Sequence, residues 1–318
     1  MAPDGGRCRG PAGIGENRAV LETRLFYSPT YVAAAYPFDT TRKAQWIAES
    51  LRERPVAGVI IAEPEPVIDS LLTAVHDPRY VEAVRTGAPR HLAESNGFPW
   101  DPGLWNAVRT STGGAVAAAV HALRSRSNAG SLSSGLHHAR RASGFGFCTF
   151  NGLALAARAA LDAGARRILI VDLDAHVGDG TLELIQDWPA VSQIDITVAP
   201  WEFNPGDPDR CSLDVITDAA EYLPTLSRRL RRMDVDGLDL CLYNAGMDVH
   251  ADCEVGGLPG MTADVIRQRE HAVFGWAARA GVPVAFVLAG GYVGARLSRD
   301  RLVALHRLTI EVASGGGR

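Results

Sequence analysis

The chain has 318 residues, 47% of them apolar, and a net charge of −4. This composition is sufficient for one large α/β domain and offers no basic surface for nucleic acid. The five cysteines include no C-x-x-C pair, which argues against a disulfide framework and a thiolate zinc site. We expect a cytoplasmic protein that does not insert into a membrane, because no signal segment opens the chain and no apolar run reaches about 18 residues.

The predicted elements begin after residues 1–22, a stretch rich in Gly, Pro and Arg that we expect to be a disordered leader before one folded domain over 23–318. Short apolar runs typical of buried parallel strands occur at Arg24–Tyr27, Val56–Ala62, Ser131–Ser134, Ile168–Leu173, Leu238–Tyr243 and Val284–Leu288. Amphipathic stretches predict helices at Thr41–Glu53, Leu104–Arg124, Gly152–Ala163, Ala219–Arg232, Ala263–Ala280 and Leu302–Val312. This alternation predicts an α/β fold, with a mostly parallel sheet and helices on both faces.

Polar side chains gather at or just past the ends of four of these apolar runs. The segments are Gly135–His138 (G-L-H-H), Asp172–Asp179 (D-L-D-A-H-V-G-D), Asn244–Asp248 (N-A-G-M-D) and Ala289–Tyr292 (A-G-G-Y). Open α/β sheets bind ligands outside the carboxyl ends of their strands. The four segments are therefore candidates for a functional site.

A metal site is indicated by Asp172, Asp174 and His176, which follow a strongly apolar run at intervals of two residues. Buried carboxylates at a strand end are costly unless a cation compensates them. Asp248 follows a second apolar run and completes an Asp/His/Asp set with Asp174 and His176. Three protein ligands leave a position open for water and substrate, as catalytic zinc requires. Oxygen-rich ligation would also tolerate Fe²⁺, Co²⁺ or Mn²⁺.

His137 and His138 are adjacent, and the two remaining carboxylates of the motif, Asp172 and Asp179, are candidates to pair with them. A carboxylate that is hydrogen-bonded to one imidazole nitrogen fixes the tautomer of the ring and raises its basicity. Two such His–Asp pairs beside a metal-activated water would form a proton-transfer apparatus for amide hydrolysis.

Tyr292 follows Gly290–Gly291, and glycines in such a place let the backbone pass close to a ligand. Its hydroxyl would then hydrogen-bond a carbonyl oxygen opposite the metal and stabilise the developing oxyanion. Taken alone, the motif fits an ordinary turn with a partly buried tyrosine equally well.

In chain order, the motifs G-L-H-H-A, G-F-C-T-F-N, D-L-D-A-H-V-G-D-G, Y-N-A-G-M-D and A-G-G-Y resemble those of zinc-dependent histone deacetylases and their bacterial relatives. The resemblance covers residues 24–313. It implies a single-domain, three-layer arginase/deacetylase-like fold with an eight-stranded parallel sheet. It also implies Zn²⁺ held by Asp174, His176 and Asp248, and a structural K⁺ beside Asp172.

The same resemblance implies the other functional residues. The implied active-site residues beside the metal are His138, His137, Tyr292, Asp172 and Asp179. The implied tunnel residues are Phe147, Asn204, Val255 and Gly290. Asn204 stands where a second aromatic wall is usual, which changes the expected shape of the tunnel. Pro37–Lys43 (P-F-D-T-T-R-K) and the loop from Tyr243 to Leu258 resemble class IV and its bacterial relatives.

These residues predict a zinc-dependent hydrolase that removes acetyl or longer fatty acyl groups from N-acyl-lysine-type amides, in a peptide, a protein or a small acyl-amine. One alternative is a small-molecule amidohydrolase that acts on acetylpolyamines or a biosynthetic intermediate. A two-manganese arginase-like hydrolase is disfavoured by the paired His137–His138 with Tyr292. An inactive module that binds acylated ligands is the alternative without catalysis. The sequence does not define the oligomeric state.

Overall fold

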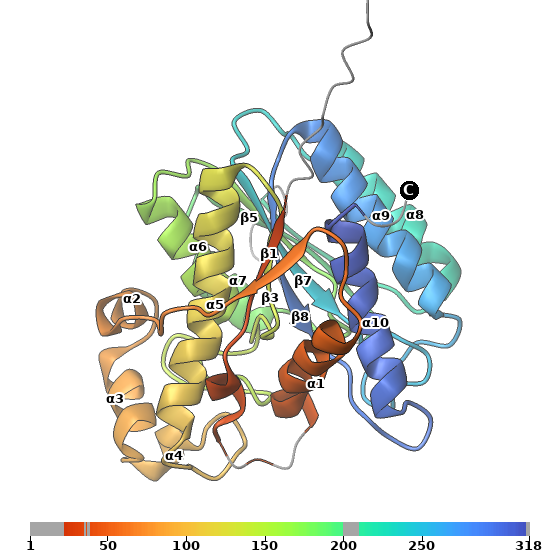
Figure 1. Cartoon of the computed structure of the whole chain (residues 1–318). Helices are drawn as coiled ribbons and strands as arrows, with labels where there is room; N and C mark the ends of the chain where they lie inside the picture. The colour runs from red at the N-terminus through yellow and green to blue at the C-terminus, as the bar shows by residue number, and fades with distance from the viewer. Residues whose placement is uncertain (1–21, 35, 37–38, 200–209, 316–318) are drawn as a thin grey trace, which may run out of the picture.

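The computed structural model describes residues 22–34, 36, 39–199 and 210–315, which form one eight-stranded sheet between helices (Figure 1). The strands are β1 (Thr23–Phe26), β2 (Val59–Ala62), β3 (Ala129–Ser131), β4 (Ile168–Asp172), β5 (Val191–Thr197), β6 (Cys211–Val215), β7 (Leu240–Gly246) and β8 (Val284–Ala289). They lie in the order β2-β1-β3-β8-β7-β4-β5-β6, and every neighbouring pair is parallel. The predicted α/β fold with a parallel sheet is confirmed.

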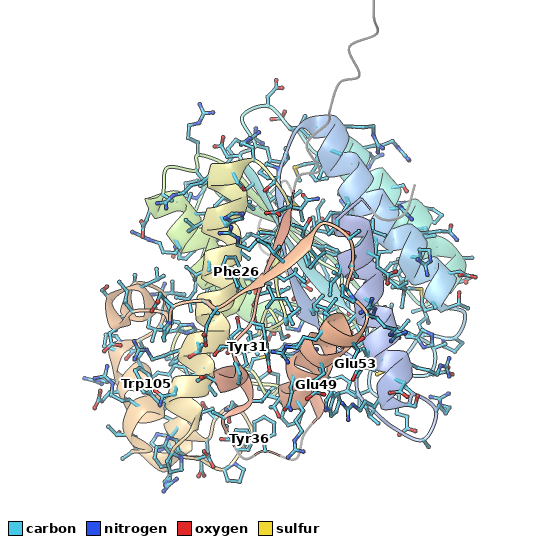
Figure 2. All side chains as sticks on the ribbon, in the orientation of Figure 1. Phe26, Tyr31, Tyr36, Glu49, Glu53 and Trp105 are labelled. Atoms are coloured by element: carbon cyan, nitrogen blue, oxygen red, sulfur yellow. The ribbon has the colours of Figure 1, made fainter. Side chains whose placement is uncertain are left out.

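Helices cover both faces of this sheet (Figure 1), and side chains of the strands, such as Phe26 of β1, pack against them (Figure 2). One face packs against α5 (Leu104–Ser125), α6 (Gly152–Asp162) and α7 (Asp179–Ile185). The other packs against α1 (Asp39–Glu53), α8 (Ala219–Arg232), α9 (Ala263–Ala280) and α10 (Arg299–Ala313). The short helices α2 (Asp69–Val75), α3 (Pro78–Thr86) and α4 (Arg90–Ala93) extend the first layer beyond α5, and the 3-10 helix η1 (Pro29–Val32) precedes α1.

Strand β4 shows why the sequences of the central strands are continuous apolar runs. Ile168 and Ile170 belong to the core on the side of α5 and α6, whereas Leu169 and Val171 belong to the core under α8 and α9. Successive side chains of a strand point to opposite faces, so a strand covered on both faces needs apolar residues at every position. The same pattern leaves Asp172, the last residue of β4, as a buried carboxylate at the edge of the core.

Two strands, four α-helices and the 3-10 helix η1 were not predicted from the sequence, and the predicted strand Ser131–Ser134 shares only Ser131 with β3. β5 carries Ser192, Gln193 and Asp195, which interrupt its apolar pattern, and β6 is a partly exposed edge strand. β7 continues to Gly246, three residues past its predicted end, because Asn244 still pairs in the ladder with Asp172. The missed helices α2, α3, α4 and α7 are each no longer than nine residues.

The expected leader over 1–22 lies, apart from Glu22, outside the residues that the structure describes. Among the helices within the described ranges, none has both the length and the apolar character needed to cross a bilayer.

Candidate active site

The four motif segments meet at the centre of the sheet. β3, β8, β7 and β4 are consecutive neighbours, and the carboxyl ends of parallel strands lie along one edge. Gly135–His138 follows β3, Asp172–Asp179 begins at the last residue of β4, and the other two segments run out of β7 and β8. The sheet order thus gathers residues that are more than a hundred positions apart in the chain.

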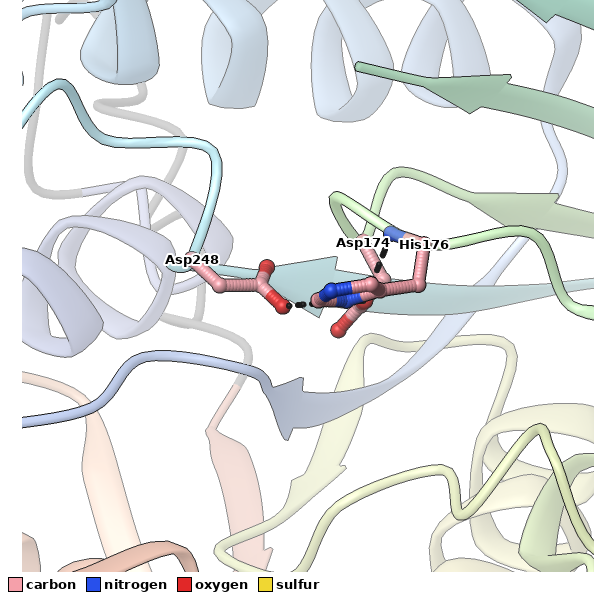
Figure 3. A group of neighbouring side chains, drawn as sticks. All are labelled: Asp174, His176 and Asp248. Atoms are coloured by element: carbon pink, nitrogen blue, oxygen red, sulfur yellow. Dashed lines mark hydrogen bonds and ion pairs between the residues drawn. The ribbon is translucent and has the colours of Figure 1, made fainter. Parts of the chain in front are cut away.

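Asp174, His176 and Asp248 form a compact cluster that could hold one metal ion (Figure 3). One ligand atom from each residue lies within 4.8 Å of the others. His176 Nδ1 lies 3.1 Å from Asp174 Oδ1 and 3.2 Å from Asp248 Oδ2. Both carboxylates are buried, and within the described residues no hydrogen bond of regular geometry reaches Asp248 Oδ2. Buried carboxylate oxygens that face an imidazole nitrogen fit a divalent cation bound by two carboxylates and one imidazole.

Backbone contacts and charge both favour this arrangement. The Ala175 N–H donates to Asp248 Oδ1 over 3.0 Å, and the His176 N–H donates to Asp174 Oδ1 over 3.0 Å. Burial, and then the charge of Asp174, raises the pKa of Asp248 to about 6. Two carboxylates this close repel each other unless a cation compensates their charge. The pair Asp174 and Asp248 therefore favours the binding of a cation.

Each histidine of the adjacent pair has its own carboxylate partner. His137 Nδ1 lies 2.8 Å from Asp172 Oδ2, and His138 Nδ1 lies 3.0 Å from Asp179 Oδ1. Arg140 also donates to Asp179, over 2.5 Å. A carboxylate at Nδ1 holds a proton on that atom, so Nε2 is the ring nitrogen that can accept or release a proton. The structure therefore pairs the four residues as the sequence predicts.

The two histidines differ in charge because their surroundings differ. Burial alone would lower the pKa of His137, but Asp172 and Asp174 outweigh it and raise this pKa to about 10. Burial and the positive charge of His137 lower the pKa of His138, although Asp179 opposes the shift. In the metal-free chain, this difference favours His138 as the imidazole that accepts a proton and His137 as the imidazole that carries positive charge.

Gly290 and Tyr292 close the site from the end of β8. Gly290 has a φ of 51°, and a Cβ there would overlap the Asp248 carboxylate. This close approach explains why glycine is needed at that position. Burial and the charges of Asp248 and Asp174 raise the pKa of Tyr292 well above 10, so its hydroxyl keeps its proton and can donate.

The expected tunnel residues line connected pockets around the cluster. Phe147, Val255 and Tyr292 line a mouth of about 180 Å³ together with His138 and His176. Gly290, Phe147 and Tyr292 line a smaller inner pocket of about 30 Å³ that Asp174 and His176 also reach. Asn204, which would shape the opposite wall, lies outside the described residues.

Two residues beside the site were not assigned from the sequence. Lys43, the only lysine of the chain, is buried, and its Nζ donates to the Gly290 carbonyl over 2.5 Å. Asn244 donates to Asp172 Oδ1 over 2.8 Å and so helps to orient the carboxylate that serves His137. The residues around Lys43 in the sequence do not indicate its contact with Gly290. The only signal that could have drawn attention to Lys43 is that it is the single lysine of an arginine-rich chain. A potassium ion beside Asp172 stays a prediction.

Comparisons with known proteins agree with this geometry. Residues 36–308 match the model of the histone deacetylase domain. The chain is 36% identical over 240 residues to an uncharacterized protein from Picosynechococcus sp., covering 73% of this chain and 78% of that protein. It is 26% identical over 305 residues to histone deacetylase 2 from Arabidopsis thaliana, covering 89% and 78%. The crystal structure of the HDA15 HD domain shares the fold, with a TM-score of 0.77 at 20% identity over 93% of this chain and 90% of that one.

The parallel α/β fold, the Asp/His/Asp cluster and the match to the histone deacetylase domain define a hydrolase of the deacetylase type. The chain belongs to the histone deacetylase family. Membership implies an acylated substrate and a metal-dependent reaction, for which the cluster is the candidate site.

Proposed function

We propose that the chain is a zinc-dependent deacylase that hydrolyses N-acyl-lysine-type amides. The observation that carries the proposal is the buried cluster of Asp174, His176 and Asp248 beside the proton-accepting His138 and the hydroxyl of Tyr292. A divalent ion bound by the cluster would act as a Lewis acid and lower the pKa of water. Fe²⁺ or Co²⁺ would suit the same ligands, so the test of this proposal includes identifying the metal that the purified protein binds.

The protein's own side chains then perform the proton transfers. His138 Nε2 accepts the proton of the attacking water, because Nδ1 is engaged with Asp179. The same nitrogen returns a proton to the leaving amine. Tyr292 donates a hydrogen bond to the carbonyl oxygen as negative charge develops on it, and His137 supplies a nearby positive charge.

The mouth of the site favours an aliphatic amide over an acetylpolyamine. Phe147 and Val255 are 41% and 47% exposed, so apolar surface surrounds the entrance. Asp179 is the only carboxylate among the described residues that line the mouth, and it is already paired with His138 and Arg140. The methylene chain of an acyl-lysine finds apolar contact there, whereas a polyamine finds no unpaired negative charge on these residues.

Tyr292→Phe should lower kcat by about 10²–10³-fold and change substrate binding much less. The variant keeps the ring that lines the pocket and removes only the hydroxyl donor. Steady-state kcat and KM on an acyl-lysine peptide measure the effect, and metal content serves as the control. Wild-type turnover in the variant would refute the role.

A cavity that adjoins the inner pocket suggests that chains longer than acetyl are accepted. It has a volume of about 90 Å³ and shares Ser134, Leu136 and Phe147 with the inner pocket. Its other walls include Leu104, Ala107, Val108 and Leu132, which are apolar. Each methylene buried there contributes about 0.8 kcal/mol to binding. The resemblance of Pro37–Lys43 to class IV supports the same reading, because that class prefers long fatty acyl groups.

The test of this proposal is kcat/KM for one peptide that carries acetyl, butyryl, octanoyl or myristoyl lysine, with an acetylpolyamine in parallel. We expect octanoyl-lysine to be processed at least as well as acetyl-lysine. Ala107→Leu narrows the cavity and should lower the octanoyl rate more than the acetyl rate. If acetyl is best and octanoyl is not processed, the long-chain proposal fails. Turnover of the acetylpolyamine alone would favour the small-molecule amidohydrolase, and no turnover at all would favour a binding module.

A further inference from the structure

Arg269 and Glu270 form an ion pair that has no contact with solvent. They are neighbours on α9, both side chains are 0% exposed, and Arg269 Nη2 lies 2.6 Å from Glu270 Oε1. Removing two charges from water is expensive, and their attraction only partly compensates this cost. Such a pair beneath a functional site calls for a role other than stability.

The remaining donors of Arg269 reach the two loops that carry the cluster carboxylates. Its Nη1 donates to the Gly246 carbonyl over 2.6 Å and to the Leu173 carbonyl over 3.3 Å. Leu173 immediately precedes Asp174, and Gly246 lies two residues before Asp248. One guanidinium nitrogen therefore connects the end of β4 with the end of β7, at the point from which the two ligand loops diverge.

Gly246 transmits this contact directly to the cluster. A Cβ at Gly246 would overlap Asp174 Cα and would lie 2.9 Å from Asp248 Oδ1. The Gly246 backbone thus packs against the Asp174 backbone and the Asp248 carboxylate. A displacement of Gly246 would therefore move both residues relative to each other.

We infer that Arg269 is a positioning residue that sets the spacing of Asp174 and Asp248 for the metal ion, while Glu270 compensates its charge. The inference rests on the proposed metal site. The planar guanidinium offers fixed donor directions, which suits it to hold two carbonyls at a defined separation. Residues that hold the metal ligands in place without touching the metal typically contribute about 10–100-fold to metal affinity.

The experiment measures Zn²⁺ affinity by chelator competition, together with thermal unfolding of the metal-free proteins. Removing Arg269 alone would leave Glu270 buried without a partner, so the main variant is Arg269→Met combined with Glu270→Leu. We expect it to bind Zn²⁺ about 10–100-fold more weakly than the wild type. Arg269→Lys keeps the charge and one donor group. Its Zn²⁺ affinity should lie between that of the wild type and that of the double variant.

Arg307 provides the matched control on α10. It is 8% exposed, donates to the Ser50 and Arg54 carbonyls over 3.1 and 2.9 Å, and lies 3.6 Å from Glu311. These carbonyls lie at the end of α1, and neither belongs to a loop that carries a residue of the cluster. Arg307→Met should therefore lower the unfolding temperature and leave the Zn²⁺ affinity unchanged.

The outcomes separate this inference from the proposed function. If the wild type binds no Zn²⁺, the metal site itself is wrong. If the wild type binds Zn²⁺ and the double variant binds it equally well, Arg269 is not a positioning residue, although the metal site stands. Equal losses of affinity in the double variant and in Arg307→Met would show a general effect of destabilisation and overturn the inference. If the double variant does not fold, Arg269→Lys decides: wild-type affinity would overturn the inference, and weaker binding would support it.

Discussion

Asp248→Ala should remove bound metal and turnover together, and Asp174→Ala should do the same. Each variant deletes one of the three proposed ligands, whose candidate ligand atoms lie within 4.8 Å of one another. The carboxylate of Asp248 is fully buried, so no water-exposed group can replace it easily. The measurements are the metal content of the purified proteins and kcat/KM on an acyl-lysine peptide.

Thermal unfolding gives a second readout that does not depend on activity. A ligand that binds only the folded state stabilises it by about 2.7 kcal/mol at a concentration of 100 times Kd. Added Zn²⁺ should therefore raise the unfolding temperature of the wild type and leave that of Asp248→Ala unchanged.

Asp252→Ala is the matched control for this experiment. Asp252 lies four residues after Asp248 in the same loop, but its carboxylate pairs with Arg301 over 2.7 Å. This variant should keep both metal and activity. If Asp248→Ala and Asp174→Ala both retain tightly bound metal in stoichiometric amount, the assignment of the metal site is wrong.

Much of the site could be predicted because its residues are carried by strand ends. The apolar run before Asp172 and the run before Asn244 both predict buried strands, and parallel strands place their carboxyl ends at one edge. From that rule alone, Asp174, His176 and Asp248 are expected near one another once β4 and β7 are neighbours. These candidate ligands can be recognised from the sequence because each motif is a continuous segment of the chain.

The supporting residues could not be predicted in the same way. Lys43 and Arg269 act on the site from helices, α1 and α9, whose sequences show only an apolar face and ordinary charges. Their contacts, to the carbonyls of Gly290 and Gly246, depend on how the helices pack on the sheet. β5 was not predicted because Asp195, a buried carboxylate within the strand, interrupts the apolar pattern.

His138→Ala should lower kcat/KM by at least about 10²-fold while metal binding is retained, since a positioned acid–base group typically contributes about 10²–10⁴-fold. The wild-type pH profile should report the same group. Burial and the charge of His137 lower the pKa of His138 from its ordinary value of 6.5. The neutral ring is the active form, so the acid limb of kcat/KM should have its midpoint below pH 6.5, and His138→Ala should lack this limb.

His121→Ala controls for the loss of an imidazole as such, because His121 lies on α5 and packs edge-on against Phe26 with ring centroids 6.3 Å apart. It should leave both kcat/KM and its pH profile unchanged. A loss of less than about tenfold in His138→Ala, or an acid limb that persists there, would assign the proton transfer to another group. His137 would be the next candidate, but Asp172 and Asp174 raise its pKa in the metal-free chain, so it would have to lose a proton before it could act as a base.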